Sequence, residues 1–343
     1  MTANQWGHIF RIHSFGESHG AGLGVLIEGC PAGLRFNEKR LELWMKRRRP
    51  GQSQFVSGRS EPDQVEILSG IYEGVTLGTP ICMMVRNQDT KSEDYEKIKT
   101  QARAGHADDV WKQKFGVSDH RGGGRSSGRE TISRVMAGCL AESLVKHLAP
   151  QIKVTGFANQ IGPFELEAQE LEGFLKSSDD FPADAYSVRF PTARVSLVEK
   201  LLSDAKAEGK SYGGQAQIIV TGLPQGLGQP VFRKLKSDFA QAALSIGASM
   251  AFELGDGWNV TGKEGSEFHT NSNSESYGGV RGGISTGEPI QFKVAFKPTS
   301  SVLDVAKKGR HDPCIVPRAV PVLEAMTWLV IADHLLWSRL DKI

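Results

Sequence analysis

Residues 119–131 read Asp-His-Arg-Gly-Gly-Gly-Arg-Ser-Ser-Gly-Arg-Glu-Thr and constrain the fold more than any other stretch of this chain. Three consecutive glycines let a backbone bend sharply or approach a ligand closely. Apolar residues then recur at helical spacing from Ile132 to Leu144, which predicts an amphipathic helix. Free backbone N–H groups and the helix dipole favour negative charge at a helix start. The stretch therefore predicts a loop for a phosphate-bearing ligand, with a tight structural turn as the alternative.

A second glycine-rich loop covers residues 278–285. Apolar and polar residues alternate after it, which predicts a strand over 290–296. This strand leads into Lys-Pro-Thr-Ser-Ser at 297–301, and Gly-Arg-His-Asp-Pro-Cys follows at 309–314. Other patterns predict strands over 8–13, 23–28, 65–68, 81–85 and 215–221, helices over 193–207, 233–250 and 319–337, and a helix that Asn37 caps and Pro50 ends.

Composition excludes several classes of protein. The chain has 343 residues and a formal net charge of +2, whereas proteins that coat nucleic acid or anionic membranes usually need a strongly basic surface. No signal-peptide pattern is seen, and the four scattered cysteines are expected to be reduced, as in a cytoplasmic protein. Segment 319–337 contains Glu324, Asp333 and His334, so we expect a buried helix rather than a membrane span. Without a low-complexity linker, residues 1–343 are predicted to form a single domain.

Arginine and histidine gather in the predicted turns. Guanidinium groups match carboxylate and phosphate oxygens, so the arginines at 48, 125, 129, 281 and 310 predict a small polyanionic substrate. His19, His106 and His311 lie where an imidazole could move a proton. No metal-ligand spacing and neither standard nucleotide fingerprint occurs in the sequence. Residues 16–20 match the Gly-x-Ser-x-Gly elbow of hydrolases, but a strand rather than a helix is predicted after them.

Taken in order, eight motifs make the chain similar to the chorismate synthase family. They are Phe-Gly-Glu-Ser-His-Gly at 15–20, Arg-Arg-Arg-Pro-Gly at 47–51, Glu-Pro-Asp-Gln-Val at 61–65, Gly-His-Ala-Asp at 105–108, the loop at 119–127, Gly-Gly-Ile-Ser at 282–285, and the segments 297–301 and 309–314. The resemblance implies an α+β fold, a β-α-β sandwich in which two antiparallel sheets enclose a helical layer, assembled as a homotetramer. Alternating strands and helices alone could equally suggest a doubly wound sheet.

The resemblance also implies a phosphate-eliminating lyase of the shikimate pathway, which serves aromatic amino acid biosynthesis. The reaction is a trans-1,4 elimination of phosphate and the C6 proton from 5-enolpyruvylshikimate 3-phosphate, which gives chorismate and requires reduced FMN without net redox change. His19 would protonate the leaving phosphate, and His106 would protonate or stabilise the reduced flavin near N1. Asp312 would act with flavin N5 to remove the C6 proton. Proton relay is assigned to serines: Ser18 and one of Ser126 or Ser127.

Carried over by motif, the cofactor contacts would be Arg125, Ser126, Ser127, Gly247, Ala248, Gly282, Lys297, Pro298, Thr299, Ser300, Ser301 and Arg310. Arg48, Gln54 and Arg129 would contact substrate or NADPH, and no metal is implied. Some members reduce their own FMN with NADPH, whereas others depend on an outside source of reduced flavin. The chain lacks the inserts of many fungal bifunctional members, which favours the second kind.

Several positions depart from the family pattern. Gln54 stands where an arginine is common, and Gly247 stands where asparagine or glutamine is usual. Ala104 replaces a proline, Gly128 replaces an alanine, and segment 302–308 is short. Two other functions stay open: a nucleic-acid-binding module that uses residues 121–125 like an RGG segment, and a flavin reductase or other NAD(P)H oxidoreductase.

Overall fold

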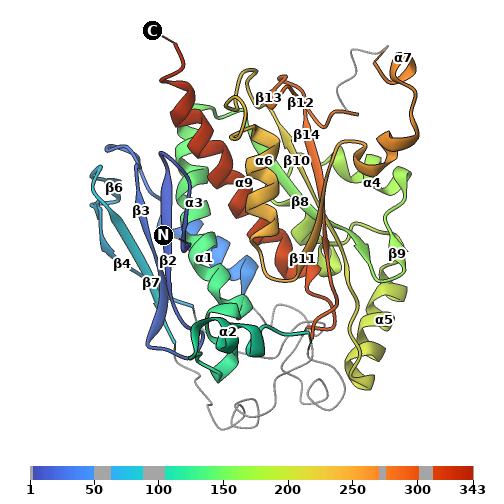
Figure 1. Ribbon diagram of the computed structural model, residues 1–343, viewed down its shortest axis with the longest axis horizontal. Coiled ribbons are helices and arrows are strands. Elements are labelled where there is room, and N and C mark those ends of the chain that lie inside the picture. The colour runs from blue at the N-terminus through green and yellow to red at the C-terminus, as the bar shows by residue number, and fades with distance from the viewer. Residues whose placement is uncertain (1–2, 50–62, 88–104, 270–275, 301–311, 343) are drawn as a thin grey trace.

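Two five-stranded sheets with helices between them form the body of the molecule (Figure 1). The computed structural model describes residues 3–49, 63–87, 105–269, 276–300 and 312–342. The first sheet has the strand order β1-β2-β3-β7-β4, and the second has the order β11-β14-β10-β8-β9. All neighbouring strands in both sheets pair antiparallel. This arrangement confirms the predicted sandwich and excludes a doubly wound parallel sheet for the described chain.

The first half of the described chain supplies the whole of the first sheet. Its elements are β1 (Gln5–Trp6), β2 (Arg11–Gly16), β3 (Gly22–Glu28), α1 (Glu38–Arg48), β4 (Val65–Ser69), β5 (Ile71–Tyr72), β6 (Val75–Thr76), β7 (Ile81–Arg86), α2 (Asp108–Phe115) and α3 (Thr131–Leu148). The elements that follow are β8 (Lys153–Ile161), β9 (Phe164–Glu165), α4 (Ala168–Leu175), α5 (Val195–Glu208), β10 (Gly214–Thr221), α6 (Leu235–Leu244), β11 (Ser249–Leu254), α7 (Gly265–Phe268), β12 (Val280–Arg281), β13 (Ile284–Ser285), β14 (Ile290–Phe296) and α9 (Val316–Ser338).

Helices α3 and α9 form the centre of the helical layer (Figure 1). Helix α3 packs on β3 of the first sheet, α9 packs on β8 and β10 of the second, and the two helices pack on each other. A Cβ atom at Gly138 would lie 2.5 Å from the Cβ atom of Ala325, so this close crossing requires a glycine in α3. The predicted helix after the glycine loop is therefore confirmed, but its predicted amphipathic character is wrong. Most residues of α3 are buried because a sheet and a helix cover opposite sides of it.

Helix α9 is the buried C-terminal helix that the sequence predicts. It is long and apolar enough to cross a membrane, but its apolar stretch is entirely buried inside the protein. Its charged residues have protein partners in the core. The carboxylate of Asp333 accepts hydrogen bonds from the backbone N–H groups of three consecutive residues, His8, Ile9 and Phe10.

Two predicted boundaries are wrong. The strand predicted over 8–13 is β2, which begins only at Arg11, because the preceding backbone N–H groups donate to Asp333 at 2.7–2.9 Å rather than to a strand. The helix predicted over 233–250 ends at Leu244, and Met250 belongs to β11. Ala248 has a φ of +70°, a left-handed conformation that ends any helical run. The turn between α6 and β11 places its residues on the wall of a large cavity.

Candidate active site

A cavity of about 1270 Å³ opens between the first sheet, the helical layer and the end of β14. Its wall combines residues that are distant in the sequence: the N-terminal strands, α2, the glycine loop, α3, the α6–β11 turn, segment 297–300 and the start of α9. A single-ligand pocket typically measures roughly 300–1,000 Å³. The cavity therefore has room for two small molecules side by side.

The three glycines of the loop adopt backbone conformations that favour glycine. Gly122, Gly123 and Gly124 have φ values of +60°, +82° and +52°. A Cβ atom at Gly122 would lie 2.2 Å from Cε1 of His19, and one at Gly123 would lie 2.8 Å from Cε1 of His106. Side chains larger than hydrogen therefore cannot fit unless these rings shift, and the loop packs directly against His19 and His106. His311, the third histidine that the sequence singles out, lies outside the described residues.

The two histidines differ in their access to the cavity. His106 lines it and is partly exposed. His19 and Ser18 are buried, and the Nδ1 atom of His19 lies 3.1 Å from the Ser18 hydroxyl. Neither residue lines the cavity; both pack against Gly122, which does. The strand β3 follows residues 16–20, so the helix that a hydrolase elbow needs is not present there.

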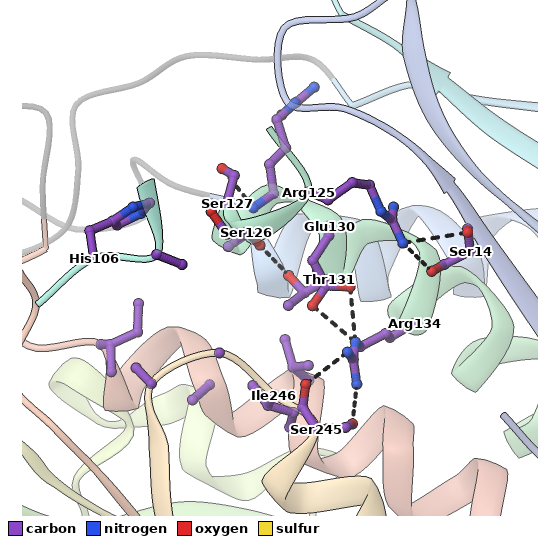
Figure 2. A pocket seen from close by; sticks show the side chains of 18 of the residues that line it. Ser14, His106, Arg125, Ser126, Ser127, Glu130, Thr131, Arg134, Ser245 and Ile246 are labelled. Carbon is purple, nitrogen blue, oxygen red and sulfur yellow. Dashed lines mark hydrogen bonds and ion pairs between the residues drawn. The ribbon is translucent and has the colours of Figure 1, made fainter. Parts of the chain in front are cut away.

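The remainder of the loop is fixed by polar contacts. The Arg125 guanidinium donates to the Ser14 hydroxyl at 2.6 Å (Figure 2). It also donates to the Gly16 carbonyl at 3.0 Å. Ser126 donates to the Gly123 carbonyl at 2.6 Å, and Ser127 accepts from the backbone N–H of the short helical turn that precedes α3. Arg125, Ser126 and Ser127 all line the cavity. The loop thus presents hydroxyl and guanidinium donors in a fixed arrangement.

Asp119 starts the loop and pairs with Arg121 at 2.8 Å. Burial alone would raise the pKa of the Asp119 carboxyl, but hydrogen bonds from Arg121 and its positive charge hold that pKa below its usual value. The carboxylate therefore stays ionised and anchors the start of the loop.

On another wall, Arg48 and Arg129 share one carboxylate. The Nη2 atom of Arg48 lies 3.3 Å from Asp63 Oδ2, and the Nη1 atom of Arg129 lies 3.0 Å from Asp63 Oδ1. Arg129 also donates to the Asn87 side chain at 2.9 Å. Both arginines are buried and line the cavity. The structure thus brings together two of the three residues predicted to contact substrate or NADPH.

Arg134 joins two walls of the cavity. It forms an ion pair with Glu130 at 3.0 Å, one helical turn earlier, and donates to the hydroxyl and carbonyl oxygens of Ser245 at 2.6 and 3.0 Å (Figure 2). Ser245 begins the turn that contains Gly247 and Ala248, both of which line the cavity. A Cβ atom at Gly247 would meet no other atom within 4 Å, so glycine leaves open space there.

The segment after β14 forms the remaining wall. Lys297 donates its backbone N–H to the Ala248 carbonyl at 3.0 Å and its ammonium group to the Gly105 carbonyl at 2.7 Å. Thr299 donates to the Asp312 carbonyl at 3.0 Å, and the Asp312 carboxylate pairs with Arg318 at 2.6 Å. Lys297, Pro298, Thr299, Ser300 and Asp312 all line the cavity.

Besides His19 and Ser18, four predicted site residues are not among the described residues that line this cavity. Gly282 lies in the turn between β12 and β13 and is not among the lining residues. Gln54, Ser301 and Arg310 lie outside the described residues. Among the described residues, no group of three or more His, Cys, Asp or Glu side chains could hold a metal ion.

The sequence interpretation missed several lining residues: Ser14, Trp111, Phe115, Glu130, Thr131, Arg134, Ser245 and Arg318. One signal was available for two of them, because Glu130 and Arg134 have opposite charges at i,i+4 spacing directly after the glycine loop. Thr131 ends the stretch 119–131 that predicts a ligand loop, and Ser245 lies two residues before the predicted Gly247. The remaining residues contact the cavity only through the tertiary fold.

The cavity wall fits a flavin mononucleotide. Arg125, Lys297 and the hydroxyls of Ser126, Ser127 and Thr299 are donors suited to a phosphate, and the glycine cradle admits close approach of a ligand to the backbone. Apolar lining from Ile246, Val322 and Met326 suits a flat ring system.

Comparisons with known proteins identify the family. The sequence profile of the chorismate synthase family matches residues 10–336. A chorismate synthase of Bdellovibrio bacteriovorus is 57% identical over 347 residues and covers 100% of both chains, and one of Opitutus terrae is 42% identical and covers 98% of this chain and 97% of its own. A chorismate synthase crystal structure superimposes with a TM-score of 0.77 at 28% identity, over 97% of this chain and 93% of the other. The chain therefore belongs to the chorismate synthase family and is a lyase that eliminates phosphate from 5-enolpyruvylshikimate 3-phosphate with reduced FMN as its cofactor.

Proposed function

We propose that the cavity holds reduced FMN and substrate next to each other, with the residue roles that the family motifs imply. One observation carries this proposal: of the nineteen distinct residues predicted as catalytic or binding, thirteen line the same cavity, and His19 and Ser18 pack against its glycine loop. The thirteen lining residues are Arg48, His106, Arg125, Ser126, Ser127, Arg129, Gly247, Ala248, Lys297, Pro298, Thr299, Ser300 and Asp312.

The flavin would lie between the glycine loop and the α6–β11 turn. Arg125, Ser126 and Ser127 of the loop would hold it together with Lys297 and Thr299 of the segment after β14, because both sets of groups line the cavity. Reduced FMN, when bound, supplies electron density that helps the substrate release its phosphate. His106 would hold a proton beside the flavin, since it packs against Gly123 at the cavity wall.

The substrate carries two carboxylates and a phosphate, so its place requires positive charge. Arg48 and Arg129, which both line the cavity, would bind these anionic groups. His19 and Ser18, behind Gly122, would deliver a proton to the leaving phosphate. Asp312 would accept the C6 proton, and its ion pair with Arg318 would fix the direction of its carboxylate.

Anaerobic turnover tests this assignment directly. Enzyme is mixed with 5-enolpyruvylshikimate 3-phosphate and dithionite-reduced FMN, and chorismate absorbance and phosphate release are followed together. Equal amounts of chorismate and phosphate that require reduced flavin are the expected result. Flavin binding without release of either product would overturn the assignment of this cavity.

The source of electrons, the assembly and the location are further parts of the proposal. We infer that the enzyme depends on an outside supply of reduced flavin, so NADPH alone should give no turnover where dithionite-reduced FMN does. Turnover with NADPH and oxidised FMN would show instead that it reduces its own flavin. We also propose a homotetrameric, cytoplasmic enzyme with one domain over residues 1–343. The single domain is supported by one hydrophobic core that extends through both sheets and the helical layer.

A further inference from the structure

Asp63 belongs to the Glu-Pro-Asp-Gln-Val motif at 61–65 and is not one of the predicted catalytic or binding residues. It lies just before β4, and its side chain is fully buried. Its two carboxylate oxygens face different partners: Oδ2 lies 3.3 Å from Arg48 and Oδ1 lies 3.0 Å from Arg129. One carboxylate therefore connects the end of α1 with the turn that precedes α3.

Two buried guanidinium groups on one cavity wall repel each other. Arg48 and Arg129 are 1% and 5% exposed, so water screens this repulsion poorly. A carboxylate between them offsets the repulsion, and because each of its oxygens contacts one arginine it also fixes where each guanidinium lies. Thr131, 3.4 Å from Arg48, and Asn87, 2.9 Å from Arg129, support the two arginines from their other sides.

The backbone of Asp63 is held in an unfavourable conformation. Its φ is +46°, in the left-handed region that residues other than glycine seldom adopt. Aspartate adopts this region more readily than most residues, and such conformations occur often at functional sites. The side chain of this residue contacts two arginines of the cavity wall.

We propose that Asp63 is a positioning residue for the substrate: it sets the relative placement of Arg48 and Arg129 so that together they receive an anionic group of the substrate. This inference rests on the proposed assignment of the two arginines to substrate binding. Asp63 itself does not line the cavity and touches no reacting atom.

The substitution Asp63→Asn separates positioning from charge. It keeps the shape of the side chain and makes the wall more positive by one charge. If Asp63 served only to tune charge, the added positive charge would tighten substrate binding. If it positions the arginines, KM for 5-enolpyruvylshikimate 3-phosphate should rise at least about tenfold, because small misplacements of binding groups are costly. The change in kcat and in FMN affinity should stay within about threefold.

A second variant guards against a general loss of structure. Asp63→Glu keeps the charge but moves the carboxylate outward by one methylene group, so positioning again predicts a raised KM. The matched control is Asp184→Asn, because Asp184 also pairs with two arginines, Arg47 and Arg189, each at 2.6 Å, away from the cavity. This control should lose stability and keep its KM.

Substrate binding to enzyme with oxidised FMN, measured by titration calorimetry, distinguishes the possible failures because it needs no turnover. If Asp63→Asn binds substrate as tightly as the wild type or more tightly, the inference about Asp63 is overturned, but the assignment of the two arginines is not. If Arg48→Met binds substrate as tightly as the wild type does, the underlying assignment of the arginines to substrate binding is overturned. Weaker binding by both Asp63 variants, with Asp184→Asn unchanged, is the expected result.

Discussion

Arg47 and Arg48 are neighbours in the last turn of α1, and both are almost completely buried, yet their side chains lie in different regions of the molecule. Successive side chains on a helix point about 100° apart. Arg47 points into the core, where it pairs with Glu324 of α9 at 2.7 Å and with Asp184 at 2.6 Å. Arg48 points to the cavity wall and contacts Asp63.

The surroundings of the two arginines explain why one stabilises the fold and the other lines the cavity. The Arg47 guanidinium lies 3.5 Å from the ring centre of Phe181, and Glu324 also accepts a hydrogen bond from the backbone N–H of Gly156 at 2.9 Å. Arg47 thereby joins α1, α9 and β8 in one buried network. Arg48 lines a cavity that a ligand can enter. The comparison teaches that a buried, paired arginine can serve either stability or binding, and that the partner's position decides which.

The largest expected effect is the loss of stability when Arg47, the arginine in the core, is replaced. Arg47→Met removes the guanidinium and leaves the buried Glu324 carboxylate without its ion-pair partner. Breaking a buried pair by removing one member costs about 3–5 kcal/mol, so the free energy of unfolding in urea should fall by that amount. Turnover per folded molecule should stay within about twofold of wild type. Lys39→Met, at an exposed position of the same helix, makes the same charge change and should alter neither quantity.

Arg48→Met should show the reverse pattern. The kcat/KM for 5-enolpyruvylshikimate 3-phosphate should fall about 100-fold, mainly through a raised KM, because the substrate loses a charged partner in a desolvated site. The free energy of unfolding should fall less than for Arg47→Met, since Asp63 keeps its ion pair with Arg129. Steady-state kinetics and urea unfolding on the same preparations check both parts. Equal losses of stability and equal losses of activity in the two variants would contradict the division of roles between Arg47 and Arg48.

Local patterns in the sequence predicted much of the fold. Strand β14 follows the alternation of Ile290, Phe292, Val294 and Phe296, all of which face the core, and Asn37 caps α1 as predicted. The family motifs predicted the sandwich and the reaction. Boundaries failed where a distant side chain or a strained turn intervened, as with Asp333 before β2 and Ala248 after α6.

The cavity was harder to predict than the fold. The helix dipole explains the basic last turn of α1 as well as a binding site does. Nothing in the local sequence shows that the neighbouring arginines of this turn point to different regions. Arg134 and Ser245 are 111 residues apart in sequence, and only the packing of α3 against the α6–β11 turn brings them together. Contacts of this kind depend on the tertiary structure and leave no periodic pattern in the sequence.

Arg134 offers a smaller test on the cavity side. Arg134→Met removes its hydrogen bonds to Ser245 and loosens the turn in which Ala248 is strained. The dissociation constant for FMN, measured by flavin fluorescence, should rise about tenfold, because hydrogen bonds that involve charged groups contribute roughly 1.5–3 kcal/mol. Arg134→Lys should lose less. Arg194→Met, which breaks comparable contacts to Glu170 and the Glu165 carbonyl outside the cavity, should bind flavin normally.

The smallest expected effect is the dependence of stability on pH, which tests the buried network of Arg47 and Glu324. Burial raises the pKa of Glu324 above its usual value, although Arg47 opposes the shift. The folded state therefore binds this proton more tightly than the unfolded state, so the stability linked to Glu324 is present at low pH and is lost as pH rises through the folded pKa.

Urea unfolding of wild type and Glu324→Gln between pH 5 and pH 8 measures this linkage. The wild type should gain stability relative to the variant as pH falls across that range, because the glutamine side chain cannot titrate. A difference that stays constant across this range would mean that burial does not raise the pKa of Glu324 above its usual value. The core network would then resemble an ordinary ion pair, and its contrast with the cavity wall would rest on position alone.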